Sequence, residues 1–280
     1  MVKPWRCDMS AKITVLITGA SSGIGQATAL LLAQRDFSVF GTARNPSGVE
    51  PISGVELLPL DVCSEESVNT CVDTVLKREG RLDVLVNNAG YGLTGVVEEV
   101  TMEEAKAQFE TNFFGVVRMV KRVLPIMRRQ GSGQIINISS GLGLGALAFT
   151  GFYSSSKFAL EGYTEALRHE VKPFRIRVSL VEPGFVQTKF RDNSQYARHP
   201  ISDYDPWRQR AAKAVQKHRE KGIEPARVAE CILQIIESKS PRLRNIVGKE
   251  IARTYLLRRV LPESLFEHGA RRYLNLDVKG

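Results

Sequence analysis

The chain has 280 residues, of which 43% are hydrophobic and 25% are charged. This composition is ordinary for a globular protein and excludes a disordered chain, and the length suffices for one domain with a sizeable buried core. No run of about 18 apolar residues occurs, so the sequence predicts no membrane-spanning helix.

The formal net charge of +9 is compatible with nucleic acid, an anionic membrane surface or an anionic ligand as partner. Many basic residues fall late in the chain, at positions 208–221 and 253–272. Solvated helix faces are the plainer interpretation, and peripheral membrane contact stays open as the alternative. No nucleic-acid-binding motif occurs, so we expect no nucleic-acid partner.

The cysteines and the start of the chain indicate the compartment. Cys7, Cys63, Cys71 and Cys231 form no C-x-x-C pair and have no metal-ligand spacing with the histidines, which predicts no metal site. Residues 1–11, a short leader, contain no apolar run of signal-peptide length. We therefore expect a reduced, cytoplasmic protein, with membrane association as the open alternative.

Short apolar, β-branched runs alternate with longer helical stretches. We predict strands at residues 13–18, 38–43, 55–60, 82–87, 134–138, 175–181 and 244–247, and helices at 24–35, 64–79, 101–129, 153–171 and 225–238. Thr101 and Glu104 form a capping-box pattern at the start of the third helix. Strands separated by helices imply right-handed crossovers. The predicted fold class is α/β, a doubly wound Rossmann fold with a single, mostly parallel sheet of about seven strands and helices on both faces.

The first predicted strand runs into a glycine-rich turn, TGASSGIG at residues 18–25, which opens a helix. Glycines let the backbone approach a pyrophosphate, and the unpaired amides and dipole at a helix start favour that anion. A tight turn without a ligand is the alternative, because the spacing G-x-x-x-G-x-G differs from the usual G-x-G-x-x-G.

Further motifs follow in a fixed order. They are Asp61 after the third strand, NNAG at 87–90, TNFFG around Asn112, NISS ending at Ser140, the pair Tyr153 and Lys157, and PGFVQT at 183–188. With the glycine turn, they resemble the short-chain dehydrogenase/reductase family over about residues 12–190. The phrase YSSSKFALEG and the long tail are most similar to its hydroxysteroid and retinol dehydrogenase branch. The resemblance implies an oxidoreductase that transfers a hydride between a nicotinamide cofactor and an alcohol or ketone.

Tyr153 and Lys157 are spaced i, i+4, so they share one helix face, and the cation is expected to lower the phenol pKa from about 10. The resemblance implies that Ser140 hydrogen-bonds the substrate oxygen, with Ser139 as the nearest misassignment, and that Tyr153 exchanges the proton. It also implies that Lys157 holds the nicotinamide ribose and that Asn112 joins a water-linked proton relay. An ordinary helix start for the pair, and a helix-distorting polar group for Asn112, are the alternatives.

Cofactor choice depends on the end of the second strand, where an NAD site usually carries an acid. This chain has Thr42, Ala43 and Arg44 there, and Arg44 can meet the extra phosphate of NADP. We therefore expect NADP(H) rather than NAD(H). 

The family pattern also assigns the remaining cofactor contacts. Asp61 is expected to accept from the adenine amino group, or alternatively to cap the next helix. The expected cofactor-binding residues are Gly19, Ser21, Ser22, Gly23, Ile24, Gly25, Arg44, Asp61, Val62, Asn88, Ala89, Gly90, Tyr153, Lys157, Pro183, Gly184, Val186 and Thr188.

Ser140 and Tyr153 are the expected substrate-binding residues, and the expected pocket walls are apolar. They comprise residues 141–152 together with Tyr91, Tyr196, Tyr204 and Trp207, although each of these side chains is equally compatible with core or interface packing. Such walls favour a lipophilic secondary alcohol or ketone, for example a steroid or retinoid. A non-catalytic dinucleotide-sensing protein is the alternative function, and an epimerase or dehydratase is disfavoured because no larger C-terminal substrate domain follows.

We expect residues 1–280 to form one domain. Within it, residues 12–190 make the cofactor-binding and catalytic core, residues 189–222 a substrate lid without clear periodicity, and residues 249–280 a C-terminal helical extension. The family commonly pairs the helices predicted here at 101–129 and 153–171, which suggests a homodimer.

Overall fold

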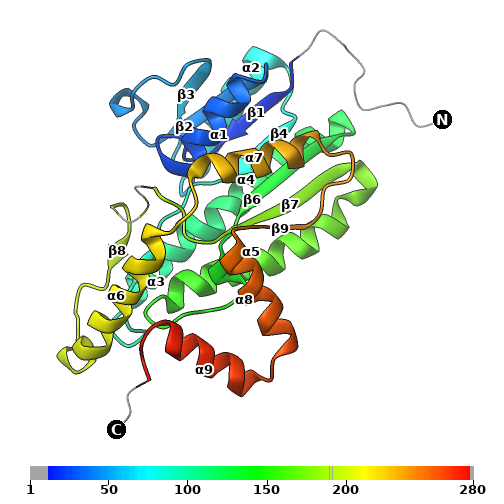
Figure 1. The fold of residues 1–280 in the computed structure, drawn as a ribbon. Helices are drawn as coiled ribbons and strands as arrows, with labels where there is room; N and C mark the ends of the chain where they lie inside the picture. Colours follow the sequence, from blue (N-terminus) through cyan, green and yellow to red (C-terminus); the bar gives the residue numbers. More distant parts are fainter. Residues whose placement is uncertain (1–11, 189, 191, 278–280) are drawn as a thin grey trace.

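The computed structural model describes residues 12–188, 190 and 192–277. A seven-stranded sheet has the order β3-β2-β1-β4-β6-β7-β9, and every neighbouring pair in it is parallel (Figure 1). Its strands are β1 (Thr14–Ile17), β2 (Ser38–Ala43), β3 (Val55–Pro59), β4 (Val84–Asn87), β6 (Gly133–Ile138), β7 (Ile176–Pro183) and β9 (Arg244–Val247). The predicted doubly wound Rossmann fold is confirmed.

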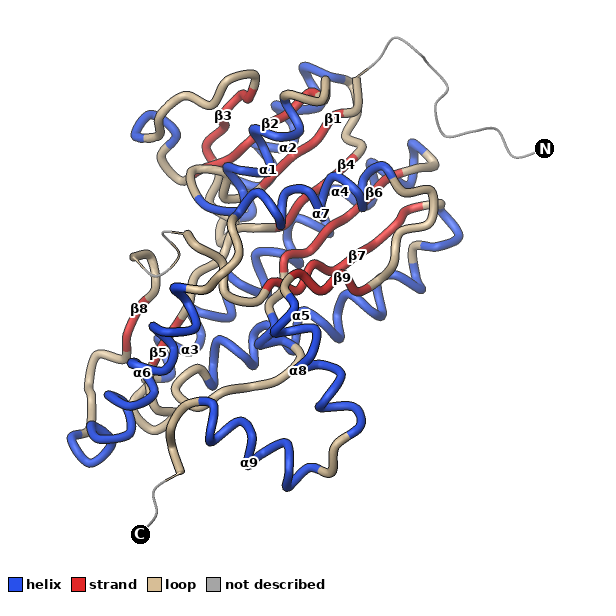
Figure 2. Tube along the Cα trace, in the orientation of Figure 1, coloured by secondary structure: helices blue, strands red, loops and turns tan. Residues whose placement is uncertain are grey.

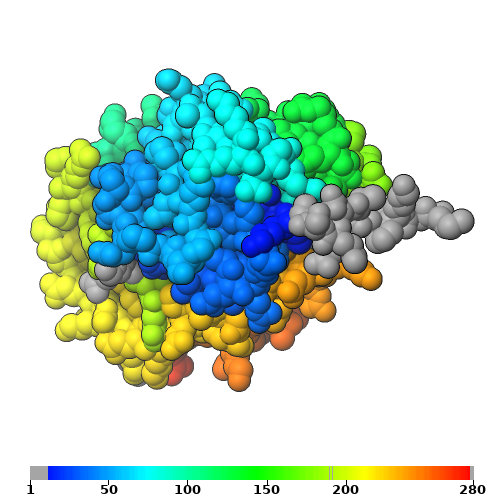
Figure 3. All heavy atoms as spheres, turned by 90° about the horizontal axis from the view of Figure 1, so that it is seen from above, coloured from blue at the N-terminus to red at the C-terminus, as the bar shows by residue number. Residues whose placement is uncertain are grey.

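Helices cover both faces of the sheet. They are α1 (Gly23–Ala33), α2 (Glu65–Glu79), α3 (Met102–Phe109), α4 (Gly115–Gln130), α5 (Gly151–Glu170), α6 (Asp205–Glu220), α7 (Pro225–Glu237), α8 (Lys249–Val260) and α9 (Glu263–Tyr273). Helices α1 and α7 lie side by side on one face, whereas α2, α4 and α5 lie on the other (Figures 1 and 2). Seen from above, the first and last thirds of the chain are packed together (Figure 3).

Alternating side chains of β1 supply both halves of the core. Val15 and Ile17 pack into the apolar cluster under α1 and α7, and Leu16 packs into the cluster under α2, α4 and α5. All three side chains are fully buried. This arrangement explains why the strand is a continuous apolar run, since both sheet faces are covered.

Chain order reverses at β1, which pairs with β2 on one side and with β4 on the other. The chain therefore leaves the carboxyl ends of β1 and β4 in opposite directions, which opens a crevice between them. Ligands bind in such crevices in open α/β sheets. The glycine turn follows β1 and the NNAG motif continues from β4, so both motifs lie at this switch point.

The predicted capping box is confirmed, because the Thr101 hydroxyl accepts from the Glu104 amide and the Glu104 carboxylate accepts from the Thr101 amide. The single helix predicted at 101–129 is wrong in one respect. A π-helical turn, η2 (Glu110–Phe114), interrupts it between α3 and α4. Such turns often occur at functional sites because they redirect side chains locally.

The expectation of an aperiodic lid is also wrong in part, since residues 205–220 form α6. Only Ala211 and Ala214 of this helix are buried, so its apolar stripe is too narrow to identify from sequence. Two short strands, β5 (Leu93–Thr94) and β8 (Gln195–Tyr196), pair in parallel beside it. Within the segment predicted as a C-terminal extension, the structure has helices α8 and α9.

No helix within the described residues is long and apolar enough to cross a membrane. Cys7 and the predicted leader, residues 1–11, lie outside the described residues.

Candidate active site

A cavity of about 2010 Å³ lies at the carboxyl ends of the strands. The glycine turn and the ends of β4, β6 and β7 form its floor, and α6, α8 and α9 lie around it (Figure 1). Most of the predicted site residues line it. They are Gly19, Ser21, Ser22, Gly23, Ile24, Arg44, Asp61, Val62, Asn88, Ala89, Gly90, Ser140, Tyr153, Lys157, Pro183, Gly184, Val186 and Thr188.

The glycine turn has the geometry of an anion cradle. Gly19 and Gly23 have φ angles of 68° and 60°, in the left-handed region that favours glycine. A Cβ on Gly19 would lie 2.9 Å from the Ala89 Cα, so a side chain would fill the approach to the turn. Ser22 makes no side-chain cap at the start of α1, whose first turn carries no acid. The first amides of α1 are therefore not capped by a side chain and are suited to bind an anion.

Gly25, predicted to contact the cofactor, does not line the cavity. A Cβ there would lie 2.2 Å from the Gly19 carbonyl oxygen and 2.5 Å from the Asn88 side-chain nitrogen. The Asn88 amide group donates to the carbonyls of Thr18 and Gly19 at 3.0 and 2.8 Å. Asn88 thus holds the glycine turn against β4 by hydrogen bonds. Gly25 leaves room for this contact because it has no side chain, and it supports the turn without lining the cavity.

Arg44 and Asp61 lie at the ends of β2 and β3. Arg44 is exposed, lines the cavity and makes no salt bridge within the described part of the chain. Asp61 accepts a hydrogen bond from the Cys63 amide at 2.9 Å. The cap of α2 is Ser64, whose hydroxyl accepts from the Ser67 amide, so the alternative reading of Asp61 as a helix cap is wrong.

Tyr153, Lys157 and Ser140 meet at the centre of the cavity. The Lys157 ammonium is 5.9 Å from the Tyr153 ring centroid and donates to the Ile138 carbonyl at 2.9 Å. The Ser140 hydroxyl accepts from the Leu142 amide at 3.1 Å and is near enough to Tyr153 to lower its pKa. Ser139 and Ser140 both line the cavity, and Ser139 is the more deeply buried of the two.

Burial controls the pKa values of this pair. It raises the pKa of Tyr153 above its ordinary value, an effect that the Ser140 hydroxyl partly offsets. Burial also lowers the pKa of Lys157 to about 8, while the nearby charge of Glu161 acts in the opposite direction. The sequence-based expectation of a lowered Tyr153 pKa is therefore wrong for the described residues, since desolvation raises this pKa by more than the Ser140 hydroxyl lowers it.

Asn112 lies in η2 and is fully buried, so it does not line the cavity. Its side-chain nitrogen donates to the Tyr91 carbonyl at 2.9 Å, and its oxygen accepts from the Tyr91 amide at 3.1 Å. The same nitrogen is 3.4 Å from the Ser156 hydroxyl on α5. Asn112 therefore ties the π-helical turn to the cavity wall and to the helix that carries Tyr153 and Lys157.

The predicted apolar walls are correct in part. Tyr91, Tyr196 and most of residues 141–150 line the cavity. Tyr204 and Trp207 do not line it, and the Tyr204 hydroxyl donates instead to Glu98 at 2.8 Å. The C-terminal segment supplies apolar walls whose residues the sequence did not identify: Ile251, Leu257, Leu261, Leu265, Phe266, Tyr273 and Leu274. Leu257, Leu261 and Leu265 recur every four residues, which was a signal in the sequence, although Leu261 lies between α8 and α9 in the structure.

An ion pair holds α6 over the cavity. Arg208 on α6 bonds Glu99, whose side chain is 1% exposed, and also bonds Asp205. Burial alone would raise the pKa of Glu99, but hydrogen bonds from the amides of Ile201 and Val96 and the charge of Arg208 bring it below its ordinary value. Glu99 is thus held as a buried carboxylate that anchors α6.

The residues along the cavity floor, from Arg44 to the pair Tyr153 and Lys157, fit an extended anionic dinucleotide. The uncapped helix start and the two positive-φ glycines suit a pyrophosphate, Arg44 provides a free cation at one end, and Tyr153 and Lys157 lie at the other. Among the described residues, no group of three or more His, Cys, Asp or Glu side chains is arranged to hold a metal.

Residues 13–198 match the family model described as short chain dehydrogenase. A 3-ketodihydrosphingosine reductase from Bacteroides thetaiotaomicron is 42% identical over 260 residues, covering 92% of this chain and 96% of that protein. Retinol dehydrogenase 8 from Homo sapiens is 39% identical over 255 residues, covering 84% of this chain and 81% of that protein.

Solved structures show the same fold. A short-chain dehydrogenase from Streptomyces avermitilis has a TM-score of 0.79 at 31% identity, covering 96% of this chain and 100% of that chain. A short chain dehydrogenase/reductase from Burkholderia phymatum in complex with NAD has a TM-score of 0.76 at 25% identity, with coverages of 89% and 93%. ElxO with NADP bound has a TM-score of 0.72 at 27% identity, with coverages of 86% and 99%.

Proposed function

The chain belongs to the short-chain dehydrogenase/reductase family of oxidoreductases, and from this premise we propose that it is an NADP(H)-dependent carbonyl reductase or alcohol dehydrogenase. Its substrate is a lipophilic secondary alcohol or ketone. The observation that carries the proposal is the meeting of Ser140, Tyr153 and Lys157 in the same cavity as the glycine turn. A dinucleotide sensor without activity has no need of these three groups together.

The bound nicotinamide supplies or accepts the hydride. Ser140 hydrogen-bonds the substrate oxygen, and the Tyr153 hydroxyl gives that oxygen a proton in reduction or takes it in oxidation. Lys157 stabilises the phenolate by its charge and binds the nicotinamide ribose. Asn112 connects to this group through the Tyr91 backbone and Ser156, which supports its role in a proton relay.

The residues that would hold the dinucleotide form a row that begins at Arg44. Asp61 and Val62 would contact the adenine, Asn88 to Gly90 would line the adenosine ribose, and the first turn of α1 would bind the pyrophosphate. Pro183, Gly184, Val186 and Thr188 bind the nicotinamide end. The close approach of Thr188 to Gly23, where a Cβ would lie 3.1 Å from the Thr188 methyl group, supports a closed cradle around the ligand.

Arg44→Ala is expected to weaken NADPH binding by about 1.5 to 3 kcal/mol and to change NADH binding little, because Arg44 meets only the extra phosphate. Solved relatives carry NAD in one case and NADP in another, so the preference rests on this residue. Fluorescence titration of each cofactor measures the effect. Arg35→Ala, outside the cavity, is the control. Equal losses for both cofactors would contradict the assignment.

The cavity supports a long, apolar substrate. Its volume of about 2010 Å³ exceeds the roughly 300–1,000 Å³ typical of small-ligand sites, which leaves room for a substrate chain beside a dinucleotide. The walls from α8 and α9 are apolar, and relatives include proteins named for a ketodihydrosphingosine and for retinol. We propose that residues 189–222 act as the substrate lid and residues 249–280 as a cover of the apolar end.

The decisive experiment follows NADPH absorbance with the full chain and a panel of ketones. The panel contains a long-chain 3-keto amino alcohol, retinal, ketosteroids, quinones and small ketones. Turnover of the lipophilic members well above that of the small ketones is expected. Cofactor binding without turnover on the whole panel would instead favour the dinucleotide sensor.

The proposal extends to the oligomeric state and the cellular location of the protein. We propose a cytoplasmic homodimer that pairs α4 and α5 with the same helices of a second copy, as the family commonly does. Exposed Leu256, Val260 and Leu265 beside the arginines of α8 and α9 keep peripheral membrane contact as the alternative location.

A further inference from the structure

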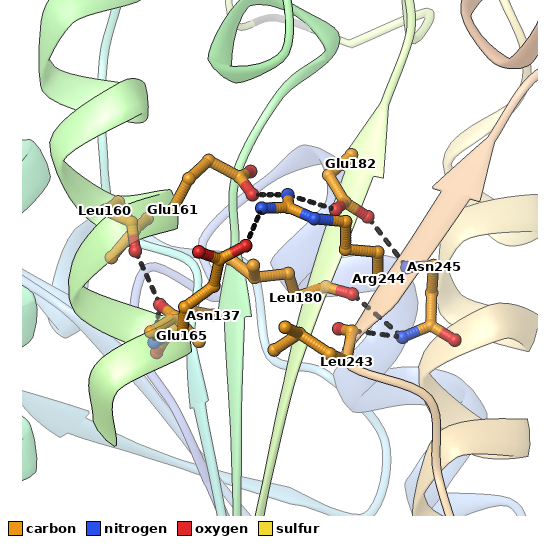
Figure 4. A network of polar contacts seen from close by, with 10 residues as sticks. Asn137, Leu160, Glu161, Glu165, Leu180, Glu182, Leu243, Arg244 and Asn245 are labelled. Carbon is orange, nitrogen blue, oxygen red and sulfur yellow. Dashed lines mark hydrogen bonds and ion pairs between the residues drawn. The ribbon is translucent and has the colours of Figure 1, made fainter. Parts of the chain in front are cut away.

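A largely buried network of charged side chains joins α5, β7 and β9 (Figure 4). Arg244 on β9 contacts Glu161 and Glu165 on α5 and lies 3.3 Å from a carboxylate oxygen of Glu182 on β7. The Asn245 amide donates to the other oxygen of Glu182 at 2.7 Å. The Arg244 guanidinium thus binds three carboxylates, two on α5 and one on β7.

Two of these carboxylates are buried. The side chains of Glu161 and Glu182 are 6% and 0% exposed, whereas that of Glu165 is 49% exposed. Burial and then the charge of Glu161 raise the pKa of Glu182 to about 7, although Asn245 and Arg244 oppose the rise. Burial raises the pKa of Glu161 as well, against Ser139 and Arg244. Like charges this close do not ionise independently, so the two acids titrate as a coupled pair.

The helix connects this pair to the active site. Tyr153, Lys157 and Glu161 are spaced by four residues on α5, so they follow one another along one face. No salt bridge joins Lys157 to Glu161 in the described chain, and the Lys157 ammonium donates to the Ile138 carbonyl. The Glu161 charge nevertheless raises the pKa of Lys157 against burial.

One oxygen of Glu161 is turned toward the end of β6. Arg244 binds Oε2 of Glu161, while Oε1 and the Ser139 hydroxyl are buried and accept or donate no hydrogen bond within the described part of the chain. A Cβ on Gly143 would lie 3.2 Å from that oxygen and 2.8 Å from the Ser139 hydroxyl, so both atoms face the same space. The two are near enough for Ser139 to lower the pKa of Glu161. The free oxygen therefore faces the strand end that carries Ser140.

We propose that Glu161 is a positioning residue that keeps Lys157 positively charged, and that Arg244 and Glu182 set how much negative charge Glu161 carries. The other charged or titratable groups facing this cluster are Glu165 on α5 and Cys231 on α7, whose pKa burial and the Glu182 charge raise. The catalytic consequence, a pH range in which Tyr153 exchanges its proton, rests on the proposed function. The effect of Glu161 on the charge of Lys157 is independent of the proposed function.

The two buried acids should act on Lys157 with opposite signs. Glu161→Gln removes the negative charge near Lys157, so the ammonium loses its proton at lower pH. Glu182→Gln removes the competitor for Arg244, so Glu161 ionises more fully and the Lys157 pKa stays or rises. A general loosening of the network would instead move Lys157 in the same direction in both variants.

The Lys157 pKa can be measured by trace acetylation of the cofactor-free full chain with acetic anhydride at a series of pH values. Mass spectrometry then quantifies the acetylated peptide that contains Lys157 at each pH. The wild-type midpoint is expected near 8. Glu161→Gln should lower it by about one unit. Glu182→Gln should leave it unchanged or raise it. Glu165→Gln removes a half-exposed, solvent-screened partner of the same arginine, so it is the matched control and should change the midpoint less than Glu161→Gln does.

An unchanged midpoint in Glu161→Gln, or a fall in all three variants, would overturn the proposal. If Glu161→Gln does not fold, Glu161→Asp keeps the charge one methylene further away and should lower the midpoint by a smaller amount. In the active enzyme, the alkaline limb of the kcat profile should follow the labelling midpoint. A midpoint shift in a protein that turns over no substrate would refute the proposed function and leave this inference standing.

Discussion

Tyr153→Phe is expected to lower turnover by about 10²- to 10⁴-fold, the range that general acid–base groups contribute. The substitution removes only the hydroxyl, which faces Ser140, and keeps the ring that packs edge-on against Phe190 at 6.1 Å. Cofactor affinity should therefore change by less than about twofold. NADPH absorbance measures the turnover, and NADPH fluorescence measures the affinity.

Tyr163→Phe provides the control on the same helix. Tyr163 packs edge-on against Phe113 and does not line the cavity, and burial raises its pKa to about 12. Its removal should leave turnover near the wild-type value. Turnover that survives Tyr153→Phe would defeat the assigned mechanism, and equal losses in both variants would indicate a packing effect instead of a proton-transfer role.

The sheet could be predicted because its information is local. The strands at residues 38–43 and 244–247 are the same in the sequence prediction and in the structure, and the other strands differ by one or two residues at their ends. A parallel strand covered on both faces is a continuous apolar run, and a helix between two such runs forces a crossover. Neither feature depends on contacts that are distant in the chain.

The floor of the site could be predicted for a related reason. Motifs that follow β1, β4, β6 and β7 all emerge at the carboxyl edge of a parallel sheet, so their order along the chain places them together. The roles of Gly25 and Asn112 could not be foreseen in this way. Gly25 acts through close packing and Asn112 through hydrogen bonds, neither of them lines the cavity, and the π-helical turn that positions Asn112 has no local sequence signature.

The lid and the charge network depend on distant contacts. Residue Arg208 meets Glu99 across 109 positions, and Arg244 meets Glu161 across 83 positions. In the sequence, each arginine looks like one of many solvated basic residues. Only the tertiary structure shows that the acid it pairs with is buried, and this burial is what makes the pair important for stability and pKa.

Arg244→Met is expected to destabilise the protein by about 3 kcal/mol or more at pH 8, because it leaves the buried carboxyls of Glu161 and Glu182 without their cation. Methionine keeps much of the side-chain volume. Urea unfolding of the full chain gives the free energy of unfolding at each pH. Arg78→Met, which removes an exposed pair with Glu56, is the control and should cost less than about 1 kcal/mol.

The pH dependence of this loss distinguishes electrostatics from packing. The folded-state pKa of Glu182 is about 7, above its unfolded value, so the native protein holds a proton that the unfolded chain releases as pH rises from about 4.3. Wild-type stability from this group therefore falls across that window. Without Arg244 the pKa values of Glu161 and Glu182 rise further, so the free energy of unfolding keeps falling to higher pH. The destabilisation caused by Arg244→Met is therefore smaller at pH 5 than at pH 8. An equal loss at both values would mean that Arg244 acts by filling space, and Glu161 would then carry no adjustable charge beside Lys157.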